Sequence, residues 1–442
     1  MLGSSRTSAE LLLPAPSREA GGYVICGFTA ADAADIPRAF TEVYGRDYLS
    51  PLVYDPEAFA DLVASGNQIS FVARDGEGDF AGHLALAFSA PNRSLVEVSQ
   101  GIVLPAHRKS GIFARLMERA VDFARHEIGA QAVFGTALTN HAVSQRVLAA
   151  CGFRDVGLEV DYVPARMLVR EGAGGPSATL VQYLDLGRHE APPCHLPPSY
   201  AAWFVRLLEG AGITGRQQVT LATGLDRRAS LSEAKDMPRF DMARLLVRRP
   251  GFDFWSLVAA RESEAESSGR HIFQVLINLG SAEGAAAVEL LRGWGYASGG
   301  LLPGYLRGGH HVAIMYRSFQ QPYFEGVKLH SESAERLLSD VVADWQYAER
   351  LGSTLRHAFR EEPADEELTG AVRADSAALP APPPPERAGA VSLDATLQML
   401  GLGGHVTLAD GGMAPLEFSS ADEEGEVTAG GEPGSDADQA TL

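Results

Sequence analysis

The sequence has few cysteines and no long apolar run. Only Cys26, Cys151 and Cys194 occur among 442 residues, and three thiols cannot form the disulfide framework of a small secreted domain. No apolar stretch approaches the roughly 18 residues that span a bilayer, and the leucines at 11–13 are too few for the apolar core of a secretory signal. These absences predict a cytoplasmic protein that does not act at a membrane.

Positive charge is also scarce. The chain has 37 Lys and Arg against 56 Asp and Glu, which gives a formal net charge of −19. A general nucleic-acid-binding protein usually presents a basic face, so we expect no nucleic-acid partner. Part of the negative charge lies in the last 20 residues, which contain acids and no Lys or Arg. The apolar content of 45% is ordinary for a globular protein, and the length is sufficient for two or three domains.

Composition divides the chain into five segments. Residues 1–20 are predicted to be a disordered leader, and residues 189–199, with four prolines, are predicted to be a linker. Residues 361–442 are rich in Ala, Pro, Gly and acids and cannot bury enough apolar surface to offset the entropy of ordering. Two folded domains are therefore expected, at 21–188 and 200–360.

Residues 101–116 carry the most informative pattern, in which a strand is followed by a basic loop and a helix. After Gly111, apolar residues recur with the spacing of one buried helix face, at Phe113, Leu116, Met117, Ala120, Val121 and Ala124. A loop that enters a helix presents free backbone N–H groups and the positive end of the helix dipole, which favour phosphate or pyrophosphate. The alternative is an ordinary strand–turn–helix whose basic turn is solvated.

The following segment predicts a second strand, at 133–140, and a short helix at 141–150. Gly152 suits the left-handed position that ends such a helix. Upstream, helices are expected at 30–44 and 55–64. Strands are expected at 23–28, 68–74, 80–88, 95–104 and 179–186.

Together these features resemble the GCN5-related N-acetyltransferase (GNAT) family over about residues 22–187. The acetyl-CoA loop of the family, Q/R-x-x-G-x-G/A, matches residues 108–113, with Phe113 in place of the final small residue. A short helix that ends in Gly-Phe, another family feature, matches Gly152 and Phe153. The resemblance implies an α/β fold with a mixed central sheet flanked by helices.

The resemblance also implies acetyl-CoA as co-substrate. The implied cofactor-binding residues are Gly101, Ile102, Val103, Arg108, Lys109, Ser110, Gly111, Ile112, Phe113 and Asn140. Backbone N–H groups of the loop would hold the pyrophosphate, and two cations would add charge. The end of the 95–104 strand would pair with the pantetheine arm.

Acetyl transfer to an amine requires a group that removes a proton from the amine. Glu97, the only acid on the 95–104 strand, is the predicted base. The alternative is a surface glutamate on a strand that alternates apolar and polar residues. His83 and His141 are further candidates because the imidazole has a suitable intrinsic pKa.

The acid that protonates the leaving thiolate has no single candidate. Many GNAT members have a Tyr four residues before the Gly-Phe pair, but Leu148 stands there in this sequence. Tyr162 or Ser144 would have to replace it, or the thiolate, with a pKa of about 8–9, would leave unaided.

The sequence also contains an internal repeat. At an offset of 143 residues (295 − 152), the pairs are Gly152-Phe153 with Gly295-Tyr296, Gly157-Leu158 with Gly300-Leu301, and Tyr162 with Tyr305. This spacing predicts a duplicated GNAT-like unit, with chance similarity of two α/β segments as the alternative. At the same offset the cofactor loop maps to residues 251–256, which lack the basic glycine loop, so the second unit is predicted to be degenerate.

The leading hypothesis is an acetyl-CoA-dependent N-acetyltransferase that modifies a primary amine of a small molecule or a protein. The alternative is a non-catalytic acyl-CoA-binding or protein-interaction module. An unrelated phosphate-binding α/β protein is disfavoured because the loop lacks both the Gly-Lys-Ser/Thr ending and the G-x-G-x-x-G pattern. We predict no metal site, and the sequence indicates neither the acceptor nor the oligomeric state.

Overall fold

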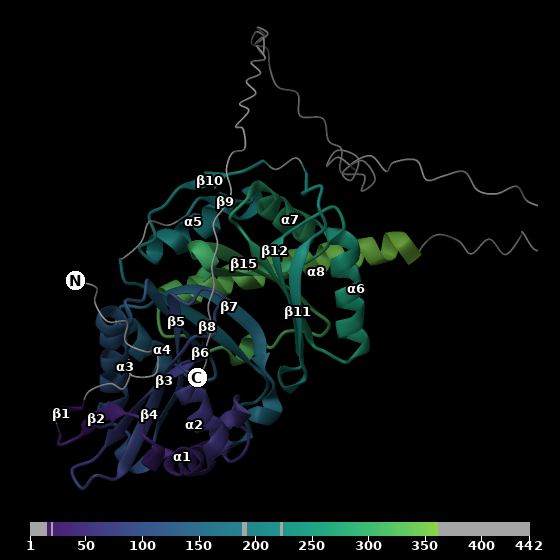
Figure 1. Cartoon of the computed structure of the whole chain (residues 1–442). Helices are drawn as coiled ribbons and strands as arrows, with labels where there is room; N and C mark the ends of the chain where they lie inside the picture. The colour runs from purple at the N-terminus through teal and green to yellow at the C-terminus, as the bar shows by residue number, and fades with distance from the viewer. Residues whose placement is uncertain (1–15, 19–20, 188–191, 222–223, 361–442) are drawn as a thin grey trace, which may run out of the picture. The chain divides into compact units, whose positions relative to one another are not determined.

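The computed structural model describes residues 16–18, 21–187, 192–221 and 224–360 (Figure 1). These residues form one 13-stranded mixed sheet with helices packed on it, together with a separate two-stranded sheet. The predicted tail at 361–442 lies outside the described residues, as does most of the predicted leader. Within the described ranges, no helix has the length and apolar character needed to cross a membrane.

The first half of the chain supplies eight strands of the large sheet. Its elements are β1 (Ser17–Arg18), β2 (Val24–Gly27), α1 (Asp35–Tyr44), α2 (Pro56–Ala64), β3 (Gln68–Arg74), β4 (Phe80–Ala87), β5 (Leu95–Val103), α3 (Ile112–Phe123), β6 (Ala132–Leu138), α4 (Val143–Ala150), β7 (Arg154–Val163) and β8 (Ser177–Asp185). Local chemistry sets several of these bounds. Asp55, for example, caps α2 by accepting hydrogen bonds from the N–H groups of Glu57 and Ala58.

The second half supplies the other five strands of the large sheet. Its elements are β9 (Cys194–Leu196), α5 (Ala201–Gly210), β10 (Gln217–Val219), β11 (Leu231–Met237), β12 (Met242–Arg249), α6 (Phe254–Ser267), β13 (Ile272–Asn278), α7 (Ala282–Gly293), β14 (Ala297–Leu306), β15 (His310–Ser318) and α8 (Glu332–Arg360). Two short strands fall in segments that were predicted to be a leader and a linker. β1 lies in the predicted leader, and β9 lies in the predicted linker and pairs in parallel with β10.

The two halves repeat the same topology. The large sheet has the order β1-β2-β3-β4-β5-β6-β8-β7-β14-β15-β13-β12-β11. Within it, the run β4-β5-β6-β8-β7 matches the run β11-β12-β13-β15-β14, and the second pair of each run, β5 with β6 and β12 with β13, is parallel. Helices α3 and α4 have counterparts in α6 and α7. As the repeat predicts, Gly295 (φ 85°) ends α7 ahead of β14, just as Gly152 (φ 94°) ends α4 ahead of β7.

A local two-fold axis relates the halves at the centre of the sheet. β7 and β14 are antiparallel neighbours, and the residues that pair, Gly157 and Gly300, are equivalent positions of the repeat. The irregularities in strand register are also equivalent, at Asp155/Gly157 and Glu159/Val163 in one half and at Ser298/Gly300 and Leu302/Leu306 in the other. This agreement supports duplication over chance similarity.

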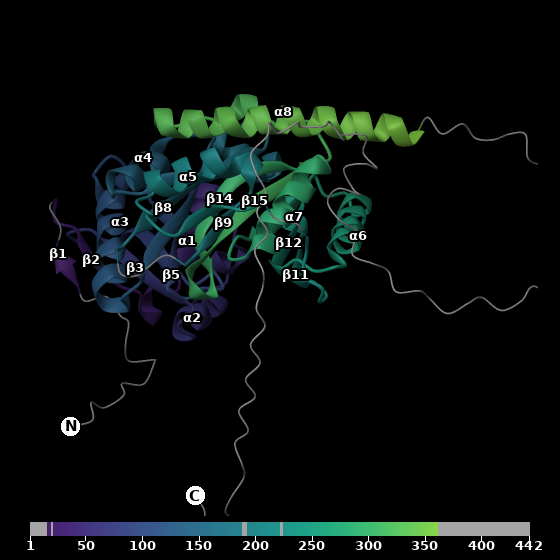
Figure 2. The same cartoon turned by 90° about the horizontal axis from the view of Figure 1, so that it is seen from above.

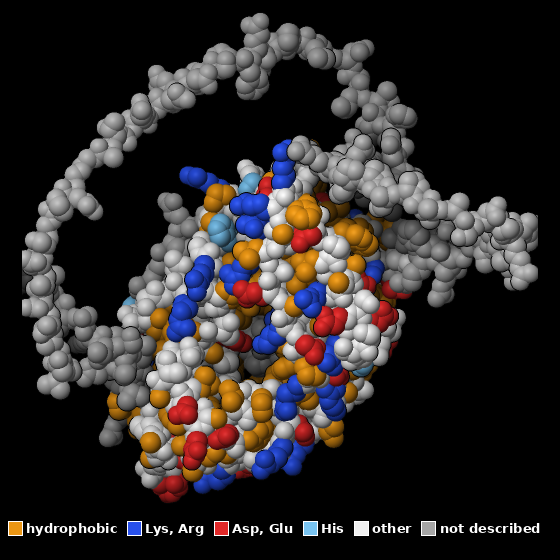
Figure 3. Space-filling view, turned by 45° about the vertical axis from the view of Figure 1, so that its right-hand side comes forward, with side chains coloured by type: hydrophobic (Ala, Val, Ile, Leu, Met, Phe, Trp, Pro, Cys, Tyr) orange, Lys and Arg blue, Asp and Glu red, His pale blue; other side chains and the backbone are white. Residues whose placement is uncertain are grey.

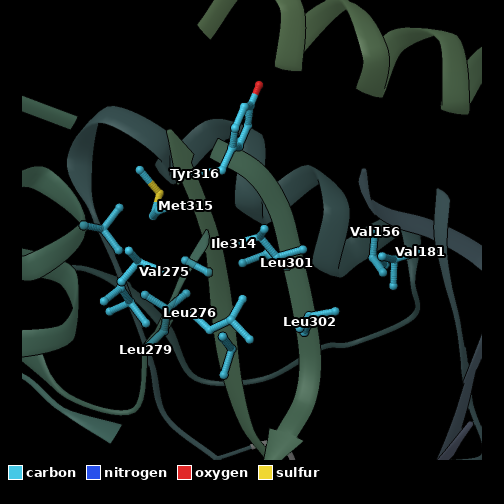
Figure 4. Close-up of a cluster of buried hydrophobic side chains, with 14 of the residues drawn as sticks. Val156, Val181, Val275, Leu276, Leu279, Leu301, Leu302, Ile314, Met315 and Tyr316 are labelled. Atoms are coloured by element: carbon cyan, nitrogen blue, oxygen red, sulfur yellow. The ribbon is translucent and has the colours of Figure 1, made fainter. Parts of the chain in front are cut away.

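The hydrophobic core is continuous across this axis. One buried cluster contains Val156 and Val181 from the first half with Val275, Leu301 and Ile314 from the second (Figure 4). Helix α8 packs against both β7 and β14 and extends along one face of the sheet (Figure 2). The two halves therefore share this cluster, while two further buried clusters lie entirely in the first half.

Strands that are distant in the sheet order face each other. Three strands separate β7 from β12, yet Arg244 on β12 forms an ion pair of 2.6 Å with Glu159 on β7. Arg239, beside β12, donates to the carbonyl oxygen of Tyr48 after α1 (2.6 Å), and Asn92 before β5 donates to the carbonyl oxygen of Gly304 on β14 (2.8 Å). The sheet therefore curls, and side chains of both halves meet on its concave side.

Candidate functional site

The first half contains an opening between two parallel strands. β5 and β6 pair only from Leu95 with Ala132 to Val98 with Gly135. Beyond this point β5 continues with β4 alone and β6 continues with β8 alone. The two strands therefore stop pairing, which leaves an opening in the hydrogen-bond ladder of the sheet.

The equivalent strands of the second half do not diverge. β12 and β13 stay paired from Met242 with Ile272 to Val247 with Ile277, and Asn278 then donates to the carbonyl oxygen of Arg248 (2.9 Å). The connection that follows is also shorter, since only residues 250–253 join β12 to α6, whereas residues 104–111 join β5 to α3. The described second half thus has neither this opening in the ladder nor room for the basic loop.

A bulge in β5 follows the point where β5 and β6 stop pairing. The β4–β5 register shifts between His83 and Ala85, and Gln100 adopts a φ of 51°, a left-handed value that is uncommon outside glycine. The side-chain amides of Gln100 and Gln68 hold each other by two hydrogen bonds of 2.9 and 3.1 Å. Bulges of this kind reorient backbone groups beside active sites, so the Gln100 peptide is a candidate to contact a bound thioester.

The basic loop ends at the start of α3, as predicted. Lys109 (φ 65°) and Gly111 (φ 82°) are both left-handed, and Ser110 Oγ donates to the carbonyl oxygen of His107 (2.7 Å) while it accepts from the N–H of Ile112 (3.3 Å). Arg108, Lys109 and Gly111 are exposed. The N–H groups of residues 109–111 have no hydrogen-bond partner in the described part of the chain. The loop therefore offers free donors and two cations to an anion.

Phe113 departs from the family pattern for a reason that the structure shows. A Cβ atom on Gly101 would lie 2.7 Å from the Phe113 ring, so the ring occupies the space beside a residue without a side chain. Ile102 and Ile112, two other predicted cofactor-binding residues, are buried in the core and can offer only their backbone. Asn140 follows the end of β6, the strand from which β5 has separated.

Glu97 lies on β5 opposite Phe134 of β6, close to where the two strands separate. Its side chain is half-buried, and the hydroxyl groups of Ser89 and Thr136 act to lower the pKa of its carboxyl. Burial raises the pKa of Glu97 above its ordinary value, and the nearby charge of Glu159 adds to this rise. The carboxyl is thereby shifted towards the range in which it can accept a proton from an amine.

Three tyrosines lie within electrostatic range of Glu97. Tyr162 on β7 and Tyr305 on β14 are equivalent positions of the repeat, and Tyr48 follows α1. Burial raises the pKa of each of these phenols, and the charge of Glu97 contributes to the rise in all three. The backbone of Gln100 at the bulge acts in the opposite direction on the pKa of Tyr48. All three phenols therefore keep their protons and can act as donors.

The other predicted site residues lie in environments that differ from that of Glu97. Burial lowers the pKa of His83 to about 4, and its Nδ1 lies 3.0 Å from the carbonyl oxygen of Gln100, so this imidazole is neutral. His141 is exposed, and Ser144 is half-buried on α4. Within the described ranges no hydrogen bond or ion pair links either residue to Glu97. Leu148 is buried, where it packs beside Gly135 of β6.

Sequence reasoning missed four residues near Glu97, namely Tyr48, Glu159, Arg244 and Tyr305. The repeat singled out Tyr305 but gave it no role. The others had no sequence signal, because their proximity depends on the curl of the sheet.

A cavity of about 420 Å³ lies where the two halves meet. Its polar lining residues are Asp161, Arg166, Asp241, His271, Ser318, Gln320, Gln321 and Tyr323. Burial raises the pKa of Asp161 to about 6, although its carboxylate accepts from the N–H of Tyr323 (3.2 Å). Figure 3 shows a face that is hollowed near its middle, with acidic and basic side chains around the hollow.

Comparison with known proteins agrees with this geometry. Residues 34–153 match the model of the Acetyltransferase (GNAT) family, so this part of the chain, about a quarter of its length, is a GNAT domain. No curated protein matches the sequence significantly.

Similar solved structures include a ribosomal-protein-S5-alanine acetyltransferase from Vibrio fischeri (16% identity, 39% of this chain and 97% of that chain, TM-score 0.33). They also include a variant of the spermidine N-acetyltransferase from Vibrio cholerae (16% identity, 37% of this chain and 94% of that chain, TM-score 0.32). Similarity at this level supports no conclusion about the substrate.

Proposed function

We propose that this protein is a cytoplasmic, acetyl-CoA-dependent N-acetyltransferase that modifies a primary amine of a small molecule or a protein. One observation carries the proposal: β5 and β6 stop pairing in the first half, Glu97 lies near the point where they separate, and the donor-rich loop follows the end of β5. Acetyl-CoA would supply an activated acetyl group as its thioester.

The chain's own residues fit this co-substrate. The N–H groups of residues 109–111 and the charges of Arg108 and Lys109 would bind the pyrophosphate. The strand end at Gly101 to Val103 would pair with the pantetheine arm, as an added strand pairs with a sheet edge. Gly111 has nothing within 4 Å of the position where a Cβ would lie, which leaves room for a phosphate.

Glu97 would act as general base. With its pKa raised, it would take a proton from the acceptor ammonium, directly or through a water molecule, and free the nitrogen lone pair for attack. The new bond forms between that nitrogen and the acetyl carbon, and the carbon–sulfur bond breaks. The nitrogen then gives up a second proton, which replaces the proton that the acid donates to the thiolate. Tyr162, whose phenol stays protonated beside Glu97, is our candidate to protonate the departing thiolate, ahead of Ser144.

We also propose that the chain is divided as the repeat suggests, with a catalytic unit at 21–188 and a degenerate unit at 200–360. The closed β12–β13 pair and the short connection after β12 support this division of roles. A non-catalytic acyl-CoA-binding module is the second candidate. It is favoured by Leu148, an aliphatic core residue where many family members have a tyrosine.

The variant Glu97→Gln tests the proposal because it keeps the shape of the side chain and removes the base. Thiol release from acetyl-CoA would be measured with a panel of primary amines and peptides. We expect the turnover rate to fall by about 10²–10⁴ with CoA affinity nearly unchanged. Glu77→Gln, the same substitution in an exposed turn, is the matched control. A Glu97→Gln variant that turns over like the parent would place the base elsewhere.

A further inference from the structure

The second half places a charged residue at the position equivalent to Glu97. In the first half the residues that lie opposite one another from β5 to β7 are Glu97, Phe134, Tyr183 and Arg154. In the second half the matching residues, from β12 to β14, are Arg244, Gln274, Tyr316 and Ala297. The strand pairing therefore makes Arg244 the counterpart of the proposed base.

Arg244 is directed towards the first half. Its Nη2 lies 2.6 Å from Glu159 Oε1 on β7, and these side chains are only 18% and 6% exposed. Two further groups fix the same carboxylate: Gln274 Nε2 donates to Oε1 (3.1 Å) and Thr179 Oγ1 donates to Oε2 (3.3 Å). The guanidinium also lies over the Tyr162 ring, 5.7 Å from its centroid. Glu159 is thus held by residues from both halves.

Groups from several elements affect the pKa of Glu97. The hydroxyls of Ser89 after β4 and Thr136 on β6 lower it, and the phenols of Tyr48, Tyr162 and Tyr305 lie within electrostatic range of the carboxyl. The nearest full charges act in opposite directions. The Glu159 carboxylate raises the pKa of Glu97, and the Arg244 guanidinium lowers it.

We propose that Arg244, in the degenerate second half, is a positioning residue for the base of the first half. By pairing with Glu159 it holds a second buried carboxylate in place and offsets its charge, so that Glu97 can lose its proton in the working pH range. The second half would then not be a second catalytic unit. It would form part of the electrostatic environment of Glu97 in the first half. The inference rests on the proposed function, since it assumes that Glu97 is the base.

The test is a carboxyl titration of the full-length protein, which needs no acceptor substrate. Protein carrying carboxyl-13C-labelled glutamate would be titrated by NMR, and the Glu97 resonance would be assigned by its loss in Glu97→Gln. We expect Arg244→Gln to raise the Glu97 pKa by about one unit and Glu159→Gln to lower it. Arg244→Lys, which keeps the charge, should stay close to the parent. The control is Arg261→Gln, which removes an exposed ion pair with Glu264 and should cause no shift.

If the Glu97 pKa shifts in opposite directions in Arg244→Gln and Glu159→Gln, a merely structural role of Arg244 does not explain the result. A folded Arg244→Gln protein with an unshifted Glu97 pKa, or shifts of the same sign in both variants, overturns the inference. Should Arg244→Gln fail to fold, a Glu159→Gln variant without a lowered Glu97 pKa overturns it equally. The proposed function fails separately, when Glu97→Gln turns over like the parent, whatever the titrations show.

Discussion

Gly300 sits on the local two-fold axis, and replacing it with alanine tests whether the two halves depend on one another. Its φ is 99°, and a Cβ atom there would lie 2.7 Å from the carbonyl oxygen of Val156 and 2.9 Å from the Cα of Gly157. Both neighbours are backbone atoms of β7 and cannot rotate away. The side chain would therefore push β7 and β14 apart at the one point where they pair.

The size of the effect follows from two costs. A Cβ in left-handed backbone costs about 1–2 kcal/mol, and overpacking a closed site costs about 1–3 kcal/mol. The lower entropy of the unfolded alanine chain offsets about 0.4–1 kcal/mol. We therefore expect Gly300→Ala to lower the free energy of unfolding by about 1–5 kcal/mol. Gly293→Ala, at the end of α7 with nothing within 4 Å of its Cβ position, is the control and should change stability by less than about 1 kcal/mol.

The assay is chemical denaturation followed by two probes. All four tryptophans lie in the second half, so fluorescence reports that half, while far-ultraviolet circular dichroism reports both. Because one core spans the axis, both probes should show a single transition that moves to lower denaturant concentration together. A Gly300→Ala protein as stable as the parent, or two separate transitions in the parent, would refute the shared-core reasoning.

Two further predictions concern the pH dependence of folding stability and the segment at residues 366–442. Burial raises the pKa of Asp161 from 3.8 to about 6, so the folded state binds its proton more tightly and loses stability as pH rises through this window. Asp161→Asn should therefore raise the free energy of unfolding by about 1–3 kcal/mol at pH 8 and change it little at pH 3.5. An equal effect at both pH values would contradict the explanation that burying the charged Asp161 carboxylate lowers stability. Deleting residues 366–442, which lie outside the described residues, should leave CoA affinity and melting temperature unchanged, and a large fall in melting temperature would show that this segment contributes to the fold.

The sequence predicted the elements whose signal is local. The alternation in β5, the apolar face of α3 and the proline at the start of α2 reflect contacts within a few residues, and the structure confirms these three elements. The match of Gly295 to Gly152 in the internal repeat predicted that a helix ends there and a strand follows, and the structure has α7 and β14 at these positions. β1 and β9 were not predicted, because two- and three-residue strands exist only through pairing with distant segments.

The candidate site could be predicted less well, because it depends on contacts between residues that are distant in the sequence. The left-handed Gln100 results from the register of β4 against β5, which no residue type in β5 signals. A single offset of the repeat could not match Glu97 with Arg244, because the two halves differ in the lengths of their connections. That equivalence emerges only from the strand pairing. The ion pair between Arg244 and Glu159 requires, in addition, that the sheet curl upon itself.

Binding of acetyl-CoA at the loop of residues 108–113 is the central claim, and titration calorimetry on the full-length protein tests it most directly. Gly111→Asp places a carboxylate against the pyrophosphate, in a left-handed conformation that aspartate tolerates and with nothing within 4 Å. Gly212→Asp makes the same change at a φ of 78°, also in open space, but in the second half. We predict that the parent and Gly212→Asp bind acetyl-CoA equally and that Gly111→Asp loses at least about tenfold in affinity, or about 1.4 kcal/mol. Equal affinity in a folded Gly111→Asp protein would contradict the account.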